Sequence, residues 1–326
     1  MAGLLCLSEF DAFLCYITEG LRLFLVITEI KILFLNKLSA IMFPPMSCSG
    51  HIKELGIIAG RGVYPGLLAK SARQKGVERI FVIAFKGETD RSIERIADEV
   101  RWLRIGKLQK FYDALESSKV GHVVMAGQIK PTHLFKVRMD KAMLSLLAGL
   151  KERNAHTIFG EIVKGIRDRG IQVEQAHVFM DSAMPAEGLI AGREPTDRER
   201  SDIELGLRVA KITSGLDIGQ TVVVKEGAIL AVEAFEGTDE AIDRAGRLGG
   251  RDAVVIKAAK QGHDMRFDIP VVGEHTFKRL KKIGASALAV EAERTILLER
   301  EKLIKIADRQ GLSFVAIRID RESRSS

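Results

Sequence analysis

Cysteine is scarce in this chain of 326 residues, and its three copies, Cys6, Cys15 and Cys48, all lie near the N-terminus. No two of them have the spacing of a metal site, and residues 49–326 contain none. A disulfide framework and thiol chemistry are therefore excluded for the body of the chain. This usage is typical of a protein from a reducing compartment.

The features of a nucleic-acid-binding protein are also lacking. Aromatic residues make up only 6% of the chain, and there is no zinc-finger spacing, basic-region heptad or aromatic-rich strand that would stack bases. The formal net charge is +7, but the basic residues are interleaved with Asp and Glu, as on a solvated surface. We therefore expect no nucleic-acid partner. The mild basic excess fits a smaller anionic ligand or an anionic membrane surface.

A clean membrane-spanning run is missing as well. The most apolar stretch, residues 21–45, is interrupted by four charged side chains, whereas a membrane helix needs about 20 mostly apolar residues. The first charges of the chain are acidic, which disfavours a secretory signal. We interpret residues 1–45 as a non-native or disordered apolar extension, with natural initiation near Met46. A helix lying in a membrane surface is the alternative.

Short apolar runs alternate with helical patterns in the first half of the body. We expect strands over residues 55–60, 79–85, 99–105 and 122–127, and helices over 65–76, 108–118, 137–150 and 157–169. This alternation predicts an α/β fold with a parallel sheet and helices on both faces. Ligands of such sheets collect at the carboxyl ends of strands, which here are residues 60–66 and 127–131.

The second half has a different order of expected strands and helices, which predicts a second α/β domain of different topology. It begins with a helix over 197–214 and a hairpin of strands 221–225 and 228–235, and Pro270 places the extended stretch 265–273 at a sheet edge. We expect a first domain over 46–180, a linker or functional loop over 181–196, and a second domain over 197–326.

The stretch GIIAGRGVYPGLLAK, residues 56–70, has the order strand, glycine turn, helix. Gly60, Gly62 and Gly66 are one residue out of step with the dinucleotide fingerprint. Lys86 directly follows the second expected strand, where a cofactor-binding domain needs an acid for the ribose, so a nicotinamide-dependent oxidoreductase is disfavoured. The turn is then either an anion site at a helix N-terminus or a plain tight turn.

The stretch KAAKQGHDMRFDIP, residues 257–270, concentrates charge. In an extended strand, Asp264, Arg266 and Asp268 point one way and the apolar residues between them point into a core. Two carboxylates beside a guanidinium suit a phosphate together with a metal or a general base. Lys257 and Lys260 lie just upstream and add positive charge. The alternative is a surface ladder of ion pairs.

A third acidic stretch, VEAFEGTDEAI, surrounds an expected strand-to-helix turn. It holds Glu233, Glu236 and Asp239. Thr238 or Asp239 is suited to cap the following helix, and the functional alternative is a metal ligand or a base. The histidines are scattered without metal-site spacing and stay unassigned.

Five stretches of the body together resemble a known family, the LpxI-type UDP-2,3-diacylglucosamine pyrophosphatases. They are GIIAGRGVYPGLLA, AGQIKP, PAEGLIAGREPT, LDIGQTVVVKEGAILAVEAFEGTDEAI and KAAKQGHDMRFDIPVVGEHTF. They run in family order from about Leu55 to Ile317. The resemblance implies that residues 46–180 form a Rossmann-like nucleotide-binding domain and residues 197–326 a catalytic and lipid-binding domain of its own topology. It also implies a cleft between them for the lipid substrate.

The resemblance also implies an activity. It is hydrolysis of UDP-2,3-diacylglucosamine in lipid A biosynthesis, with water attacking the α-phosphorus to release UMP and 2,3-diacylglucosamine 1-phosphate. A divalent metal, Mg²⁺ above all, is implied, as are a homodimer and a cytoplasmic location with peripheral contact to the inner membrane. The alternatives are the oxidoreductase and a non-catalytic nucleotide- or lipid-binding module.

Carried over to this sequence, the resemblance implies a set of site residues. The catalytic carboxylate is expected among Asp268, Asp264 and Asp239, with Asp264 and Asp268 also as metal ligands. The expected substrate-binding residues are Gly60, Arg61, Gly62, Pro65, Gly127, Lys130, Lys257, Lys260 and Arg266. Two departures from the family stand out: Arg61 in the glycine turn, and Asn154-Ala155-His156 where relatives often have an acidic pair.

Overall fold

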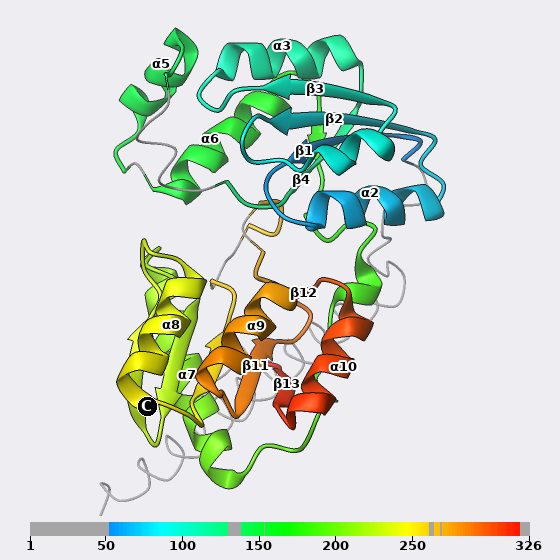
Figure 1. Cartoon of the computed structure of the whole chain (residues 1–326). Helices are drawn as coiled ribbons and strands as arrows, with labels where there is room; N and C mark the ends of the chain where they lie inside the picture. Colours follow the sequence, from blue (N-terminus) through cyan, green and yellow to red (C-terminus); the bar gives the residue numbers. More distant parts are fainter. Residues whose placement is uncertain (1–51, 130–137, 153, 261–263, 268, 320–326) are drawn as a thin grey trace, which may run out of the picture. The chain divides into compact units, whose positions relative to one another are not determined.

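The first sheet is the parallel one that the sequence predicts. The computed structural model describes residues 52–129, 138–152, 154–260, 264–267 and 269–319, so the extension predicted over residues 1–45 lies outside it. The strands are β1 (Glu54–Ala59), β2 (Arg79–Phe85), β3 (Glu99–Leu103), β4 (His122–Ala126) and β5 (Gln172–Val173). They run parallel in the order β3-β2-β1-β4-β5 (Figure 1). The direction of winding reverses between β1 and β4, which is where such sheets bind ligands.

Helices cover both faces of this sheet because its strands are apolar on both sides. The helices are α2 (Tyr64–Gln74), η2 (Arg91–Arg95), α3 (Leu108–Ser118), α5 (Lys141–Gly149) and α6 (Ala155–Arg167). Ile57 packs in one cluster with α2, whereas its neighbour Ile58 packs in another with α3 and α6. The alternation of side chains along β1 therefore sorts the helices onto two faces.

The second sheet is mixed. Its strands are β6 (Gly188–Ala191), β7 (Thr221–Lys225), β8 (Ala228–Val232), β9 (Val254–Lys257), β11 (Ala287–Glu291) and β13 (Ser313–Ile317), in the order β6-β13-β11-β9-β7-β8. The three central strands β13, β11 and β9 are parallel, and β7 and β6 pair antiparallel to them. The carboxyl ends of β9 and β11 therefore meet at one edge of the sheet.

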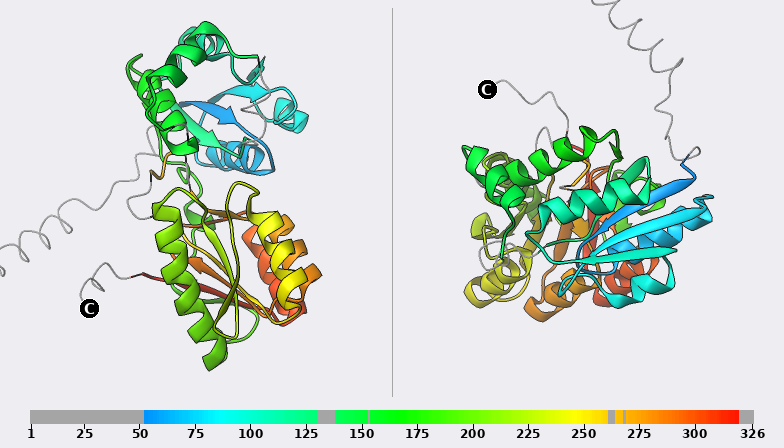
Figure 2. Two further views of the ribbon diagram at one scale, coloured as in Figure 1. Left: turned by 90° about the vertical axis from the view of Figure 1, so that its left-hand side faces the viewer. Right: turned by 90° about the horizontal axis from the view of Figure 1, so that it is seen from above.

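Four helices enclose the second sheet: α7 (Asp197–Gly215), α8 (Thr238–Gly249), α9 (Glu274–Ile283) and α10 (Arg300–Gln310). α7 packs on one face with Val222 and Val254, and the other three pack with Val223 and Val255 (Figure 2, left). α7 begins with a capping box, in which Thr196 and Glu199 satisfy each other's backbone N–H groups. These observations confirm the α/β class and the different topology of the second half.

A small parallel pair, β10 (Val271–Val272) with β12 (Ile296–Leu297), is shared between two cores. Val271 and Ile296 pack in the cluster that contains β1 and α2. Val272 and Leu297 pack in the cluster of α9 and α10. Successive side chains of β10 and β12 therefore pack into different hydrophobic clusters. The segment after β9 thus contacts both clusters.

Two expectations need correction. Residues 264–267 form a turn, in which the Phe267 N–H donates to the carbonyl of Asp264, so the predicted extended face of alternating charges is wrong for this stretch. The segment 181–196, predicted as a linker or loop, carries the short helix η3 (Asp181–Ala183) and β6, which adds an edge strand beside β13. The sequence did not predict this strand, because Gly188 and Pro185 are typical of turns and loops.

Candidate functional site

The glycine turns after β1 and β4 lie in contact at the point where the first sheet reverses. The Gly60 N–H donates to the Ala126 carbonyl over 2.7 Å, and Arg61 and Gln128 exchange backbone hydrogen bonds. A Cβ on Gly60 would lie 2.6 Å from the Gln128 oxygen, and one on Gly127 2.6 Å from the Arg61 oxygen. Only glycine fits at these two positions, because the obstructing atoms belong to the backbone.

The start of α2 is the part of this turn that faces open space. Gly62 has a φ of 91°, and nothing lies within 4 Å of where its Cβ would be. Pro65 stands in the first turn of α2, where a missing N–H costs nothing. The first N–H groups of a helix have no intrahelical partner, so this end can accept an anion. The structure brings together five predicted residues here: Gly60, Arg61, Gly62, Pro65 and Gly127.

Arg61, the departure in the glycine turn, has an acidic partner that sequence reasoning missed. Its Nε atom lies 3.5 Å from Oε2 of Glu88, whose side chain is fully buried. Thr89 fixes the loop after β2, because its hydroxyl bonds to the Ala59 carbonyl at the end of β1. An acid therefore does follow the second strand, two residues beyond Lys86. The signal available in the sequence was an acid close to the end of that strand.

The carboxyl edge of the second sheet holds a buried cation, Lys257, at the end of β9. Lys257 is 6% exposed, and its Nζ donates to Thr238 Oγ1 at 3.3 Å and to the Val271 carbonyl at 3.1 Å. Thr238 in turn donates to Glu233 Oε1 at 2.9 Å. Within the described part of the chain, Lys257 forms no ion pair with a carboxylate. A buried ammonium held only by neutral acceptors is suited to bind an anion.

Asp239 lies next to Thr238 at the start of α8, and the structure rejects the capping interpretation for this turn. Gly237, with a φ of 88°, occupies the cap position, and no side chain caps the helix. Asp239 Oδ2 instead lies 3.1 Å from Nδ1 of His275, the second residue of α9. His275 had no role in the sequence analysis because nothing near it in sequence suggested a partner.

A second pair of charges lies at the same edge of the sheet but is already neutralised. Lys211 Nζ is 2.7 Å from Glu291 Oε2 and donates to the Ala259 carbonyl. Burial lowers the pKa of Lys211, and the hydrogen bond that Lys211 donates to Glu291 opposes this shift. Lys260, a predicted substrate-binding residue, pairs with Asp217 at 2.7 Å. These groups are less available to a ligand than Lys257.

Asp264 and Arg266, predicted to share a phosphate site, bind each other. Asp264 Oδ1 accepts from Arg266 Nε at 2.8 Å, and its Oδ2 accepts from the same guanidinium at 2.5 Å. Burial raises the pKa of Asp264, but the hydrogen bonds from Arg266 outweigh it, so the net shift is downward. Asp264 is therefore an ionised carboxylate with both oxygens engaged. Asp268 and Lys130 lie outside the described residues.

The predicted metal site finds no support among the residues that the structure describes. No group of three His, Cys, Asp or Glu side chains within them is arranged to hold a metal ion. Asp264 is committed to Arg266, and its predicted co-ligand Asp268 is not described. We therefore derive no chemical step through a metal.

Asn154, the other departure from the family, has a structural task. Its side chain caps α6 by accepting from the Thr157 N–H at 2.8 Å. The ring of the neighbouring His156 packs against Phe267, with centroids 5.5 Å apart. The pair therefore fixes the start of α6 and supports the turn that contains Arg266.

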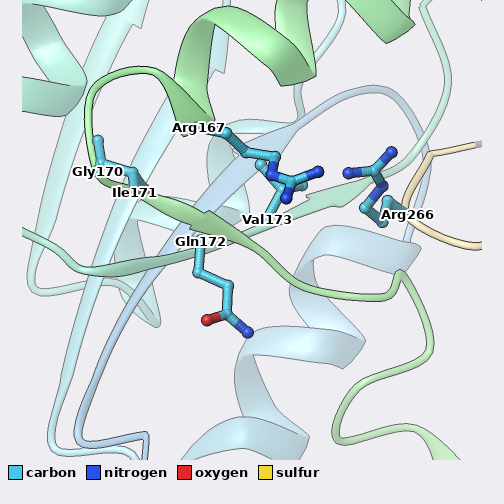
Figure 3. Close-up of a pocket in the computed structure, with 6 residues that line it drawn as sticks. All are labelled: Arg167, Gly170, Ile171, Gln172, Val173 and Arg266. Carbon is cyan, nitrogen blue, oxygen red and sulfur yellow. The ribbon is translucent and has the colours of Figure 1, made fainter.

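A cavity of about 560 Å³ opens between the end of α6, β5 and the turn at residues 264–267. Two guanidinium groups line it, those of Arg167 and Arg266, and they extend toward one another (Figure 3). Arg167 is exposed and has no acidic partner among the described residues. Sequence reasoning missed Arg167, because only the fold brings the end of α6 to this turn. Two facing guanidinium groups favour an anionic group such as a phosphate.

The fold and these sites define a two-domain α/β protein. One sheet has glycine turns of the kind that bind nucleotides, and the other has a buried cation at its carboxyl edge. Family models agree with this class. The model of the LpxI N-terminal domain matches residues 54–183, and that of the LpxI C-terminal domain matches residues 186–315. The chain belongs to the LpxI family, which confirms the resemblance seen in the sequence.

A curated relative covers nearly the same extent. The chain is 30% identical over 280 residues to the UDP-2,3-diacylglucosamine pyrophosphatase LpxI of Caulobacter vibrioides, a match that spans 82% of this chain and 98% of that protein. Among solved structures, the biotin carboxylase domain of the Hydrogenobacter thermophilus 2-oxoglutarate carboxylase is 12% identical with a TM-score of 0.22. That match covers 60% of this chain and 40% of the other.

Proposed function

We propose that the chain hydrolyses the diphosphate of UDP-2,3-diacylglucosamine, releasing UMP and 2,3-diacylglucosamine 1-phosphate for lipid A biosynthesis. The observation that carries the proposal is the match to the Caulobacter vibrioides pyrophosphatase, which spans 98% of that protein and therefore both domains. The sites described above support it, because each is suited to an anionic ligand. The oxidoreductase and the non-catalytic binding module gain no support from the family match.

The glycine edge of the first sheet is suited to the nucleotide part of this substrate. Open space at Gly62 and the start of α2 offers N–H groups to a phosphate oxygen. Glu88 holds Arg61 at the same edge, where its guanidinium is part-exposed. We assign UMP to this edge, with Arg61 as a direct contact.

Cations are needed where the diphosphate is cut. Water must approach a phosphorus atom that carries negative oxygens, and fixed positive groups lower the cost of the charge that develops. Lys257 is buried and free of carboxylate partners among the described residues, and Arg167 and Arg266 face one cavity. We assign phosphate contacts to Lys257, to Arg167 and to the Nη1 side of Arg266, because Asp264 occupies only Nε and Nη2 of that guanidinium. Of the three predicted catalytic carboxylates, Asp239 is the one whose carboxylate contacts a histidine among the described residues, and we assign it to the catalytic machinery.

Four further properties remain part of the proposal. They are a divalent metal such as Mg²⁺, a homodimer, a cytoplasmic location and peripheral contact with the inner membrane. In the part of the chain that the structure describes, no helix is both long and apolar enough to cross a bilayer. Metal dependence is measured by adding EDTA and then restoring Mg²⁺, dimerisation by sedimentation, and membrane contact by flotation with anionic vesicles.

The activity is tested with the purified chain and UDP-2,3-diacylglucosamine. We expect UMP and the sugar phosphate in equal amounts, and no UMP release contradicts the proposal. Hydrolysis in ¹⁸O-labelled water also locates the bond that forms. Label in UMP confirms attack at the α-phosphorus, and label in 2,3-diacylglucosamine 1-phosphate moves the attack to the β-phosphorus.

A further inference from the structure

Asp239 and His275 form a pair at the mouth of the α8–α9 interface, and its chemistry goes beyond ion pairing. The carboxylate meets the Nδ1 side of the imidazole, with Oδ2 at 3.1 Å and Oδ1 at 3.3 Å. When Nδ1–H donates to Asp239, the lone pair of the ring lies on Nε2, on the opposite side. The His275 side chain is 66% exposed, so a ligand can reach that atom.

The ordinary explanation is that this pair belongs to a ladder of ion pairs between two helices. One turn further along, Asp243 of α8 pairs with Arg279 and Lys282 of α9, and Asp243 is buried. That second contact is structural: it joins the helices, which are close enough that a Cβ on Gly246 would lie 2.4 Å from Ile283. The Asp239–His275 contact differs because the imidazole is exposed and its Nε2 side is open to a ligand.

The surroundings of the pair match a site for anions. Lys257 lies between the starts of the two helices: its Nζ bonds to Thr238, adjacent to Asp239, and to the carbonyl of Val271, four residues before His275. Both His275 and Asp239 lie in the first turn of a helix. The first N–H groups of a helix attract anions.

We propose that His275 is a catalytic base of the hydrolysis, with Asp239 as its positioning residue and Lys257 as the cation of the site. This inference rests on the proposed function and names a further residue for it. His275 Nε2 takes a proton from water as the water oxygen bonds to phosphorus. The anhydride P–O bond breaks, the bonding electrons leave with the phosphate monoester, and Lys257 offsets its charge. His275 then returns its proton to solvent, so the net products are two monoesters and one proton.

The test compares His275→Ala and His275→Gln with His122→Gln as the matched control. His122 is also paired to a carboxylate, since its Nδ1 lies 2.7 Å from Glu174, but it lies on β4 of the other sheet. We expect the two His275 variants to lose about 10²–10⁴-fold in kcat with little change in KM, the range of general acid–base catalysis. Circular dichroism and Tm stay at the wild-type values, and His122→Gln keeps its activity.

Chemical rescue separates catalysis from structure. Free imidazole restores part of the kcat of His275→Ala, because the exposed position leaves room for it, and does not stimulate the wild type. Asp239→Asn lowers kcat less, and combining it with His275→Ala costs nothing beyond His275→Ala alone. A His275→Ala variant within about threefold of wild type overturns the inference, and so does a loss that imidazole does not rescue. Absence of UMP release by the wild type is a different result, which contradicts the proposed function itself.

Discussion

The ammonium of Lys257 lies 3.3 Å from the hydroxyl of Thr238 and 3.1 Å from the carbonyl of Val271, in the interior at the end of β9. Both acceptors are neutral, so burial of this charge is not offset by an ion pair among the described residues. We infer that a bound anion supplies the negative charge that the described neighbours of Lys257 lack.

Replacing Lys257 by Met tests this explanation. We predict that Lys257→Met lowers kcat/KM about 10²–10³-fold, as loss of a group that stabilises developing charge does. Tm stays the same or rises, because a buried charge gives way to an apolar side chain of similar length. Lys225→Met is the control: its ammonium also bonds to a backbone carbonyl, that of Gly249, but at the far end of α8. A fall in Tm without loss of activity in Lys257→Met contradicts the assignment.

Adding a methyl group to the glycine turns tests the contact between β1 and β4. We predict that Gly60→Ala and Gly127→Ala each destabilise the protein by about 1–3 kcal/mol or more, because the new Cβ meets backbone atoms that cannot move aside. Gly66→Ala is the matched control, with Ile96 at an ordinary 3.7 Å, and gains up to about 1 kcal/mol from helix propensity. Urea unfolding measures all three, and equal stabilities would refute the close approach.

Glu199 gives stability a defined pH dependence. Burial alone raises its pKa, but hydrogen bonds from Arg193, Thr196 and Ser286 outweigh burial and lower the pKa to about 2. Because the folded pKa lies below the unfolded value near 4.5, its contribution is complete above pH 4.5 and is lost as the pH falls toward 2. We predict that Glu199→Gln costs about 1.5–3 kcal/mol at pH 7, because Arg193 loses its charged acceptor while glutamine can still complete the capping box. The difference from wild type disappears in urea titrations near pH 2, and a constant difference contradicts this account.

Arg167 tests the cavity beside the 264–267 turn. We predict that Arg167→Gln raises KM for UDP-2,3-diacylglucosamine about tenfold or more, the effect of losing one hydrogen bond to a charged group. Lys110→Gln removes a positive charge from an exposed position on α3, outside this cavity, and leaves KM unchanged. Steady-state kinetics of UMP release measure both. An unchanged KM in Arg167→Gln would remove the cavity from the substrate site.

Local sequence signals predict most of the fold. The run RIFVIAF and the helix LQKFYDALESS have the predicted bounds, because apolar periodicity and a glycine or a lysine in the left-handed region fix their ends. The turn at residues 264–267 escaped prediction, since alternating charged and apolar residues also suit a strand. Tertiary contacts decide there: Phe267 packs with His156 and Phe159 on α6.

The candidate site was predictable only where one segment carries it. The glycine turn and Lys257 are visible in their own motifs, whereas the Arg61–Glu88, Asp239–His275 and Arg167–Arg266 relationships join residues from different elements. Separations of 27, 36 and 99 positions leave no local pattern in a single sequence. The roles of Asp268 and Lys130, outside the described residues, stay predictions.

The central claim is that this chain hydrolyses a diphosphate and that both domains supply groups that bind its phosphates. The most direct measurement supplies the purified chain with UDP-2,3-diacylglucosamine and follows UMP and 2,3-diacylglucosamine 1-phosphate by ³¹P NMR. The account predicts that both monoesters appear in equal amounts in the wild type and that Lys257→Met, while remaining folded, forms them about 10²–10³-fold more slowly. An unchanged diphosphate signal with the wild-type protein would contradict it.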